Sequence, residues 1–202
     1  NYDDDFLWSE DGAGIYLYSS DPILSNLVIT ENSTFSGIGG GIFIFNSAPV
    51  LNNVIISNNE GIIGSGIYIR NSTALLNTVT INSNVPNRGI IIVESYSTIL
   101  SDVIVSNNIG GGISIHESTD ISLTDVLITE NTYAWDGGGM YLFNTYNSMF
   151  TNVTISGNTT SDKGGGIYLA HSDPTLTNVT ITGNTADSYG GGMWLSSYSD
   201  PT

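Results

Sequence analysis

Two short blocks of alternating apolar and polar residues recur along the chain. The first block is Gly-Ile, then an outward residue that is often aromatic, then an aliphatic residue, as at residues 41–44 and 166–169. The second block is Leu-x-Asn-Val-x-Ile-x-x-Asn, and its clearest copy spans residues 176–184. Alternation with period two is typical of β-strands, and no stretch shows a sustained helical period. The pattern therefore predicts an all-β chain.

The first block returns at intervals of 23–27 residues. Its glycines are Gly14, Gly41, Gly66, Gly89, Gly112, Gly139, Gly166 and Gly192. One copy is too short to bury its own apolar face, so the copies must stack on one another. This predicts a parallel β-helix, a solenoid of about eight coils of 23–27 residues.

Stacking turns equivalent residues into columns. We expect the last Asn of the second block to form an internal ladder, in which each side-chain amide bonds the next coil. Its members are Asn32, Asn59, Asn84, Asn108, Asn131, Asn158 and Asn184. The glycine runs before the first block suit a bend where coils approach closely. Insertions fall between the ladder Asn and the motif Gly, so they should lie on one edge of the rod, which in solenoids often carries binding.

These motifs carry a family resemblance that covers essentially the whole chain. The sequence resembles the right-handed parallel β-helices of the pectate-lyase-like superfamily, and more closely the repeats of polymorphic outer-membrane proteins of bacteria. The matching motifs are Gly165-Gly166-Ile167 and Ile181-x-x-Asn184. The resemblance implies a right-handed helix and an extracellular or cell-surface location, but the scaffold hosts many activities.

Both ends of the sequence align within repeats, and neither shows a polar capping element. We therefore expect residues 1–202 to be a single β-helix fragment, uncapped at both ends, that continues into further coils or domains of a longer chain.

Composition narrows the possible partners. The chain has 3 Lys and Arg against 19 Asp and Glu, a formal charge of −16, and no cysteine. Without a basic patch, nucleic acid is not an expected partner. No apolar run is long enough to span a bilayer as a helix, so we expect no membrane insertion by this segment.

The outward positions of the first block form an aromatic column. Its aromatic members are Tyr16, Phe43, Tyr68, Tyr141, Tyr168 and Trp194, and it is interrupted at Ile91 and Ser114. Exposed rings could bind a glycan or a protein partner. The alternative is that aromatic residues favour strands and pack on their neighbours across coils.

Coils four and five offer the best carboxylates for chemistry. Glu94 and Glu117 occupy equivalent positions on adjacent coils, and so do Asp102 and Asp125. Carboxyls about 5 Å apart suit a retaining glycosidase. The alternative is that the aspartates replace Asn in its column and the glutamates are solvated. Arg88, His116 and Asp120 lie in the same two coils.

Enzymes of the resembled superfamily also include lyases that use Ca²⁺ held by Asp residues together with an Arg or Lys. Here the cations are only Arg70, Arg88 and Lys163, on different coils. A separate calcium site could use Asp3 and Asp5 in the acidic first loop, although no known calcium motif is present.

We therefore interpret the chain as a structural or adhesive segment of a secreted or cell-surface bacterial protein. It would be a rod that binds a partner or acts as a spacer between other parts of the protein, needs no cofactor, and is not an enzyme. The alternative hypothesis is a carbohydrate-active enzyme, either a polysaccharide lyase or a glycoside hydrolase, that acts on an extracellular glycan with the four carboxylates of coils four and five.

Overall fold

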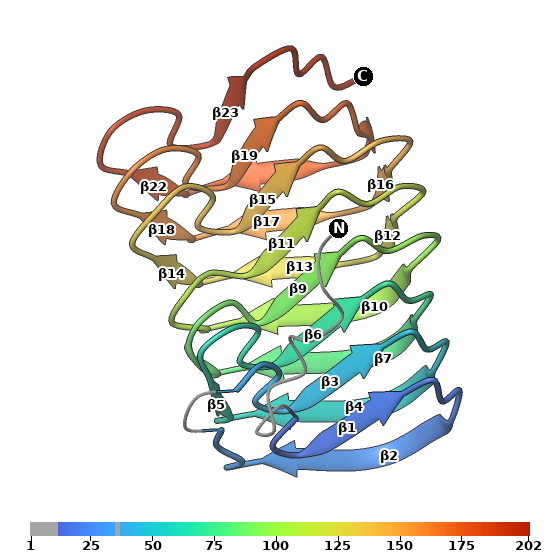
Figure 1. The fold of residues 1–202 in the computed structure, drawn as a ribbon. Helices are drawn as coiled ribbons and strands as arrows, with labels where there is room; N and C mark the ends of the chain where they lie inside the picture. The colour runs from blue at the N-terminus through green and yellow to red at the C-terminus, as the bar shows by residue number, and fades with distance from the viewer. Residues whose placement is uncertain (1–11, 35–36) are drawn as a thin grey trace.

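A computed structural model describes residues 12–34 and 37–202, which wind into stacked coils as a right-handed parallel β-helix (Figure 1). The regular elements of the described residues are all strands. This confirms the predicted all-β solenoid. The first sheet contains eight strands, and each marks one coil, numbered one to eight below. They are β1 (Ile15–Tyr18), β3 (Ile42–Phe45), β6 (Ile67–Arg70), β9 (Ile90–Val93), β11 (Ile113–His116), β15 (Met140–Phe143), β19 (Ile167–Ala170) and β23 (Met193–Ser196).

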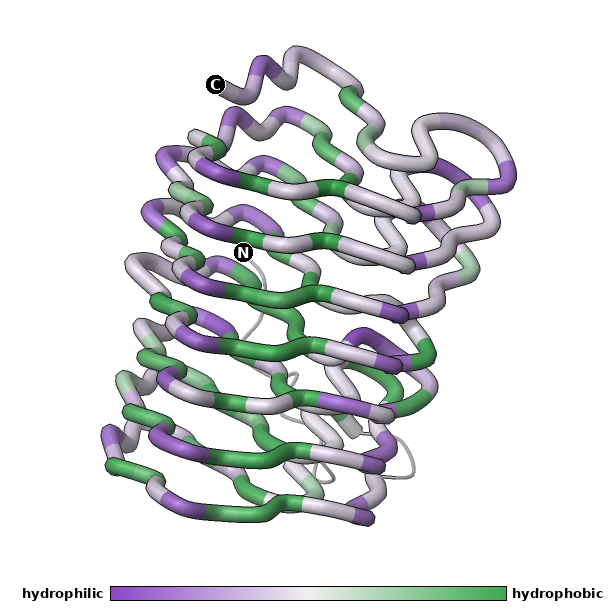
Figure 2. The backbone as a smooth tube through the Cα atoms, turned by 180° about the vertical axis from the view of Figure 1, so that it is seen from behind, coloured by the Kyte–Doolittle hydropathy of each residue, from purple (hydrophilic) through white to green (hydrophobic). Residues whose placement is uncertain are grey.

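The second sheet is formed by the Leu-x-Asn-Val-x-Ile block. Its long strands are β2 (Ile23–Thr30), β4 (Val50–Ser57), β7 (Leu75–Asn82) and β10 (Ile99–Ser106). In later coils the block divides into β12 (Ser122–Thr124) and β13 (Leu127–Thr129), β16 (Met149–Thr151) and β17 (Thr154–Ser156), and β20 (Thr175–Thr177) and β21 (Thr180–Thr182). Seen from behind, hydrophobic and hydrophilic positions recur at the same place in successive coils (Figure 2).

Short strands follow the ladder Asn at the loop edge. They are β5 (Glu60–Gly61) and β8 (Val85–Pro86), which pair, and the stack of β14 (Thr132–Tyr133), β18 (Thr159–Thr160) and β22 (Thr185–Ala186). The wide loops beside β14, β18 and β22 all lie on the same edge of the rod (Figure 1). The prediction that insertions gather on one edge is therefore confirmed.

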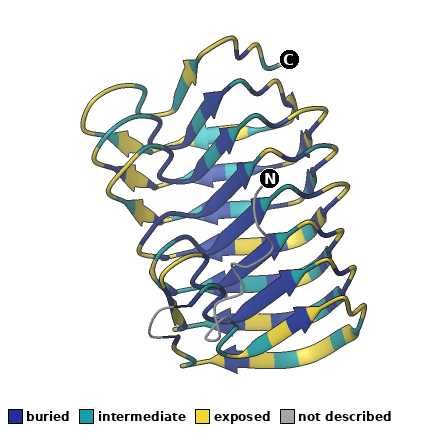
Figure 3. Cartoon of the chain, in the orientation of Figure 1, coloured by how far each residue is buried: buried dark blue, intermediate teal, exposed yellow. Residues whose placement is uncertain are grey.

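Apolar side chains fill the space between the sheets. In coil five, Ile113 and Ile115 of the first sheet and Leu123 and Ile128 of the second are fully buried. Burial is concentrated on the strands of the middle coils, whereas the first and last coils are more exposed (Figure 3). Each middle coil thus depends on its neighbours to remove its apolar surface from water.

The predicted Asn ladder is present and satisfies its polar atoms. The Oδ1 atom of Asn108 accepts hydrogen bonds from the backbone N–H and the side-chain amide of Asn84, both at 3.0 Å. Its Nδ2 donates to Oδ1 of Asn131 at 2.9 Å and to the carbonyl of Ile81 at 3.2 Å. Asn108 has no exposed surface. A buried amide is tolerated here because it finds partners above and below.

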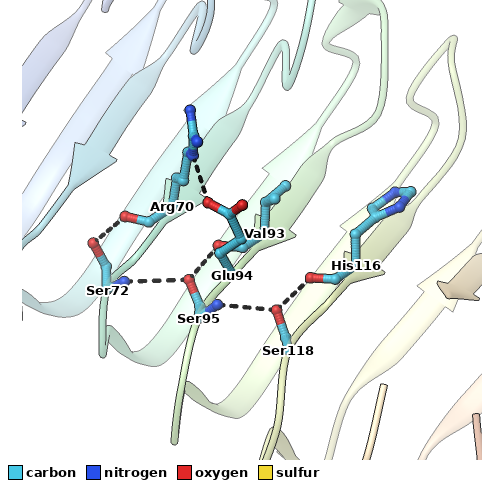
Figure 4. Close-up of polar contacts among 7 residues, drawn as sticks. All are labelled: Arg70, Ser72, Val93, Glu94, Ser95, His116 and Ser118. Atoms are coloured by element: carbon cyan, nitrogen blue, oxygen red, sulfur yellow. Dashed lines mark hydrogen bonds and ion pairs between the residues drawn. The ribbon is translucent and has the colours of Figure 1, made fainter. Parts of the chain in front are cut away.

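A second internal ladder, not anticipated from the sequence, runs along the turn after the first sheet. The backbone N–H of Ser72 donates to Oγ of Ser95 at 3.3 Å, and that of Ser95 donates to Oγ of Ser118 at 3.1 Å (Figure 4). Each hydroxyl in turn donates to a carbonyl two residues earlier in its own coil. Small hydroxyl residues are therefore required at this turn.

Close packing between coils, including contact with the Asn ladder, explains the motif glycines. A Cβ on Gly112 would lie 2.4 Å from the carbonyl oxygen of Gly139 and 2.8 Å from Cγ2 of Ile128. It would also lie 3.1 Å from Nδ2 of Asn131. Gly112 is therefore fixed by close approach between coils, as predicted, rather than by an unusual backbone angle.

Candidate functional site: a pocket at coils four to six

The outward aromatic column consists of two stacks of rings separated by a gap. The Tyr16 and Phe43 rings stack at 5.0 Å between centroids, Phe43 and Tyr68 at 5.6 Å, and Tyr141 and Tyr168 at 5.1 Å. Between the stacks, coils four and five carry Ile91 and Ser114. Ser114 has no ring at this position, and it is 1% exposed because the His116 imidazole lies against it, 5.3 Å from the Tyr141 ring.

The two stacks differ in accessibility. Phe43 is 3% exposed and Tyr68 is 8% exposed, because these rings form a small cluster with Ile91 that Ile38 also packs against. This part of the expected exposed stripe is covered, and the packing alternative describes it better. Tyr141, Tyr168 and Trp194 are partly exposed, and Tyr16 is exposed. These four remain predicted ligand contacts.

A pocket of about 340 Å³ lies at the gap, within the size range of ligand sites. Three parts of the chain build it: the segment just before β9, the outer face of β11 and β15, and β14 with the loop that follows it. Its lining residues are Arg88, Ser114, His116, Tyr133, Trp135, Asp136 and Tyr141. The pocket forms where loop length changes, since the motif Gly comes four residues after the ladder Asn in coil five (Asn108, Gly112) and eight residues after it in coil six (Asn131, Gly139).

The loop that supplies Trp135 and Asp136 is fixed by the coil after it. The hydroxyl of Thr160 donates to the carbonyl of Trp135, and the backbone N–H of Lys163 donates to Oδ1 of Asp136 at 3.1 Å. The N–H of Gly137 donates to the carbonyl of Lys163 at 2.9 Å. The Trp135 side chain itself is 68% exposed. A rigid loop thus presents a large ring to solvent, which lowers the entropy cost of binding a ligand.

Arg88 holds the same loop from the other side. Its guanidinium donates to the carbonyls of Asp136 and Gly137, both at 2.8 Å. It also lies 4.2 Å from the centroid of the Tyr133 ring. Burial lowers the pKa of Arg88 to about 10, so it stays charged at neutral pH. In the described part of the chain no carboxylate forms an ion pair with it, so carbonyl dipoles and ring faces stabilise the charge.

The Arg88 side chain can extend past coil five because that coil has a glycine, Gly111, next to the guanidinium. A Cβ on Gly111 would lie 2.8 Å from Nη1 of Arg88, and Gly111 has a φ of 96°, which disfavours other residues. Gly111 therefore leaves room for the Arg88 side chain of the preceding coil.

His116 and Ser114 form the floor of the pocket. Oγ of Ser114 lies 2.6 Å from Nε2 of His116, and the His116 ring centroid lies 5.3 Å from that of Tyr141. Burial, and secondarily the charge of Arg88, lowers the pKa of His116 to about 4. The imidazole is therefore neutral at pH 7. A Ser–His pair can act as nucleophile and base, but no third side chain among the described residues is seen to orient this ring.

Asp136 is the carboxyl of the pocket lining. Burial raises its pKa, with a further contribution from the charge of Asp162, while the Lys163 backbone hydrogen bond opposes the shift. A glycosidase requires two carboxyls that flank the scissile bond. The lining offers hydrogen-bond donors and acceptors beside three aromatic rings, and Asp136 is its single carboxyl.

The four carboxylates suggested by the sequence lie elsewhere. Glu94 and Glu117 occupy the turn after the first sheet, both with φ of 47°, and Glu94 pairs with Arg70 at 2.9 Å (Figure 4). Asp102 and Asp125 are exposed at the bend within the second sheet, with φ of 53° and 55°. None of the four lines the pocket of Arg88.

Asp125 takes the place of an Asn in its column, as the structural alternative for these aspartates expected. Oδ1 of Asp125 accepts a hydrogen bond from Nδ2 of Asn152 at 3.0 Å, and Asn53 bonds Asn26 in the same way at 2.8 Å. These residues share a positive φ, a conformation that Asn and Asp tolerate better than most side chains. A structural role therefore accounts for Asp125.

Other expectations concern metals and membranes. Asp3 and Asp5 lie outside the described residues. Within residues 12–34 and 37–202, no group of three or more His, Asp or Glu side chains is arranged to hold a metal ion. No helix in that part of the chain is long and apolar enough to cross a membrane.

Fold and pocket together define a parallel β-helix with a loop-edge cavity. The family model for the right-handed β-helix region matches residues 65–202, and the chain belongs to this family. A search of curated proteins gave no match.

Two solved structures are distantly similar. A candidate glycosyl hydrolase from Parabacteroides merdae is 11% identical with a TM-score of 0.39, over 82% of this chain and 83% of that one. HetL, a pentapeptide repeat protein of the cyanobacterium Nostoc involved in heterocyst differentiation regulation, is 12% identical with a TM-score of 0.25, over 87% of each chain. Such scores carry no argument about activity.

Sequence reasoning identified Arg88 and His116 as residues of the most promising coils but missed their partners. Asp120, grouped with them, does not line the pocket. Tyr133, Trp135 and Asp136 were overlooked because they belong to β14 and the loop after it, outside both repeat blocks. The available signals were the interruption of the aromatic column at Ser114 and the abrupt lengthening of the next loop.

Proposed function

We propose that this chain is a non-catalytic glycan-binding segment of a secreted or cell-surface protein. The stacked coils serve as a rigid rod, and the pocket over β11 and β15 holds a sugar. The observation that carries the proposal is the exposed Trp135 ring on a loop fixed from both sides, above a hollow with polar groups at its base.

The chemistry of the pocket suits a neutral sugar. Aromatic faces pack against the C–H groups of a pyranose, and the exposed Trp135 ring supplies such a face. Arg88 covers one face of Tyr133, and Tyr141 stacks on Tyr168, so these two rings line the pocket beside it. Asp136 and His116 can exchange hydrogen bonds with hydroxyls. Because the chain carries a charge of −16, a polyanionic glycan would be repelled at long range.

A binding screen with Trp135→Ala tests this proposal. The 202-residue chain is titrated with cellohexaose, xylohexaose, mannohexaose and chitohexaose, each with added calcium and with a chelator. Tyr189→Ala is the matched control, because Tyr189 is 61% exposed and lies outside the pocket.

We expect at least one hexasaccharide to bind. Trp135→Ala should weaken its affinity about tenfold or more, roughly the contribution of one buried ring. Tyr189→Ala should stay within about twofold of the wild type. Unchanged affinity in a folded Trp135→Ala protein, or no binding by any of the four sugars, would overturn the proposal.

A second candidate function, a polysaccharide lyase, is favoured by the meeting of Arg88, His116 and Tyr141 in one pocket. Neutral His116 would take the C5 proton of a uronate, Arg88 would balance its carboxylate, and the C4–O bond would break as the C4–C5 double bond forms. The Tyr141 hydroxyl would protonate the leaving C4 oxygen. Binding is better supported, because backbone carbonyls already occupy the Arg88 donors. Ultraviolet absorbance of an unsaturated product from polygalacturonate, lost in His116→Ala, would favour the lyase instead.

A further inference from the structure

A second hollow of about 320 Å³ lies at the turn that follows β11 and β15. Its lining residues are Tyr96, Glu117, Ser118, Thr119, Asn144 and Tyr146. Tyr96 and Tyr146 are 54% and 52% exposed. Each forms a parallel bridge with Thr119, so the two tyrosines are equivalent residues of coils four and six. Two coil spacings separate them by about 10 Å, and the small Thr119 leaves a slot between them.

The two hollows are formed in the same way on the same coil. Coil five carries a small side chain, Ser114 or Thr119, where its neighbours carry larger ones. Consecutive residues line the two hollows: His116 lines the first, and Glu117 lines the second. Ser114 and Thr119 are five residues apart, so at most about 17 Å of extended chain separates them.

We infer that the two hollows are subsites of one extended site that runs across the rod, along coil five, and binds a linear neutral oligosaccharide. The inference rests on the proposed function and deepens it from a single sugar to a chain. Because the chain turns at Glu117, where φ is 47°, the distance between Ser114 and Thr119 is below the extended limit of about 17 Å, and the site holds at most about three or four pyranose units of roughly 5 Å each. Rings at each subsite pack on sugar faces, and Asp136 and Glu117 accept hydroxyl hydrogen bonds near the two ends.

The positions of the two carboxylates argue for a neutral chain. Glu117 is exposed beside the second slot, and Asp136 lies at the first. Arg88, the cation of the region, is 4% exposed, and its donors hold backbone carbonyls. Lys163, the other cation near Asp136, already lies 3.9 Å from Asp162. A uronate chain would therefore meet a carboxylate at both subsites, and both nearby cations already have partners.

The test is a length series of the sugar that binds best among the four hexasaccharides, from the disaccharide to the hexasaccharide. Affinities are measured calorimetrically for the wild type, Trp135→Ala and the double variant Tyr96→Ala with Tyr146→Ala. Tyr189→Ala is again the control, and thermal unfolding confirms that each variant is folded. Tyr96 and Tyr146 are exposed, so their removal should leave the core intact.

Wild-type affinity should rise at least tenfold between the disaccharide and the tetrasaccharide and then level off. The double variant should lose at least tenfold for the hexasaccharide and less than twofold for the disaccharide. Trp135→Ala should weaken both sugars. These results together would support one extended site.

Two other patterns separate the hypotheses. If Trp135→Ala abolishes binding while affinity is independent of length and of Tyr96 and Tyr146, the extended site is wrong and the pocket alone binds. If Trp135→Ala has no effect on any length, the proposed function fails, and the extended site fails with it.

Discussion

The guanidinium of Arg88 lies 4.2 Å from the centre of the Tyr133 ring, so a cation from coil four supports a loop that leads into coil six. The contact spans the intervening coil, where Gly111 leaves room. A nearest-neighbour description of the solenoid therefore omits the interaction that shapes its pocket.

Replacing Arg88 should destabilise the rod more than replacing the other arginine. Arg88→Ala leaves the carbonyls of Asp136 and Gly137 without their donors, and we expect a loss of about 2–4 kcal/mol in the free energy of unfolding. Arg88→Lys keeps the charge but not the planar fork, and should be intermediate. Urea unfolding followed by circular dichroism measures both.

Arg70→Ala is the matched comparison. The Arg70–Glu94 pair is about one third exposed on each side, so its loss should cost less than about 1 kcal/mol. Equal effects of Arg70→Ala and Arg88→Ala would contradict the role assigned to the buried guanidinium.

His116 should make stability depend on pH between about 6.5 and 4. Its pKa in the folded chain is about 4, so in this window the unfolded chain binds a proton that the folded chain does not. Stability therefore falls as pH drops from about 6.5 to 4, by up to roughly 3 kcal/mol. Denaturant unfolding at several pH values, compared with His116→Gln, isolates this contribution from that of the carboxyls. If the free energy of unfolding of His116→Gln depends on pH as that of the wild type does, His116 is not the source of this dependence.

Asn108→Ala should destabilise the Asn ladder by about 2–4 kcal/mol. It removes the acceptor of the Asn84 backbone N–H and of its side-chain amide, and both groups are buried. Asn107→Gly is a suitable control, because Asn107 is exposed and has a φ of 55° that glycine accepts readily. Thermal unfolding should show a clear decrease for Asn108→Ala and a small change for the control.

Gly112→Ala should also be destabilising, although it adds a single methyl group. The added carbon would lie 2.4 Å from the Gly139 carbonyl, so adjacent coils must separate at the cost of roughly 1–3 kcal/mol. Gly157→Ala gives the comparison, since a Cβ there has its nearest contact at 3.5 Å, although its φ of 64° carries a conformational cost of its own. A melting temperature for Gly112→Ala at or above that of Gly157→Ala would be inconsistent with close coil packing.

Much of the architecture could be predicted from residues that repeat. The Ile and Val positions, the final Asn of the second block and the motif Gly each follow from stacking, because a column repeats the same environment in every coil. The Ser ladder through Ser72, Ser95 and Ser118 was accessible by the same logic. Serines are frequent enough in this sequence that the column did not stand out.

The sequence by itself therefore determined the solenoid, its coils and its Asn ladder, since periodic contacts need only periodic residues. The tertiary structure decided the pocket. It depends on a single small residue, Ser114, on a loop that carries Trp135, and on Arg88, which reaches that loop across coil five. Such a combination occurs once among residues 12–34 and 37–202, so no repeat signals it, and only the fold shows that these side chains meet.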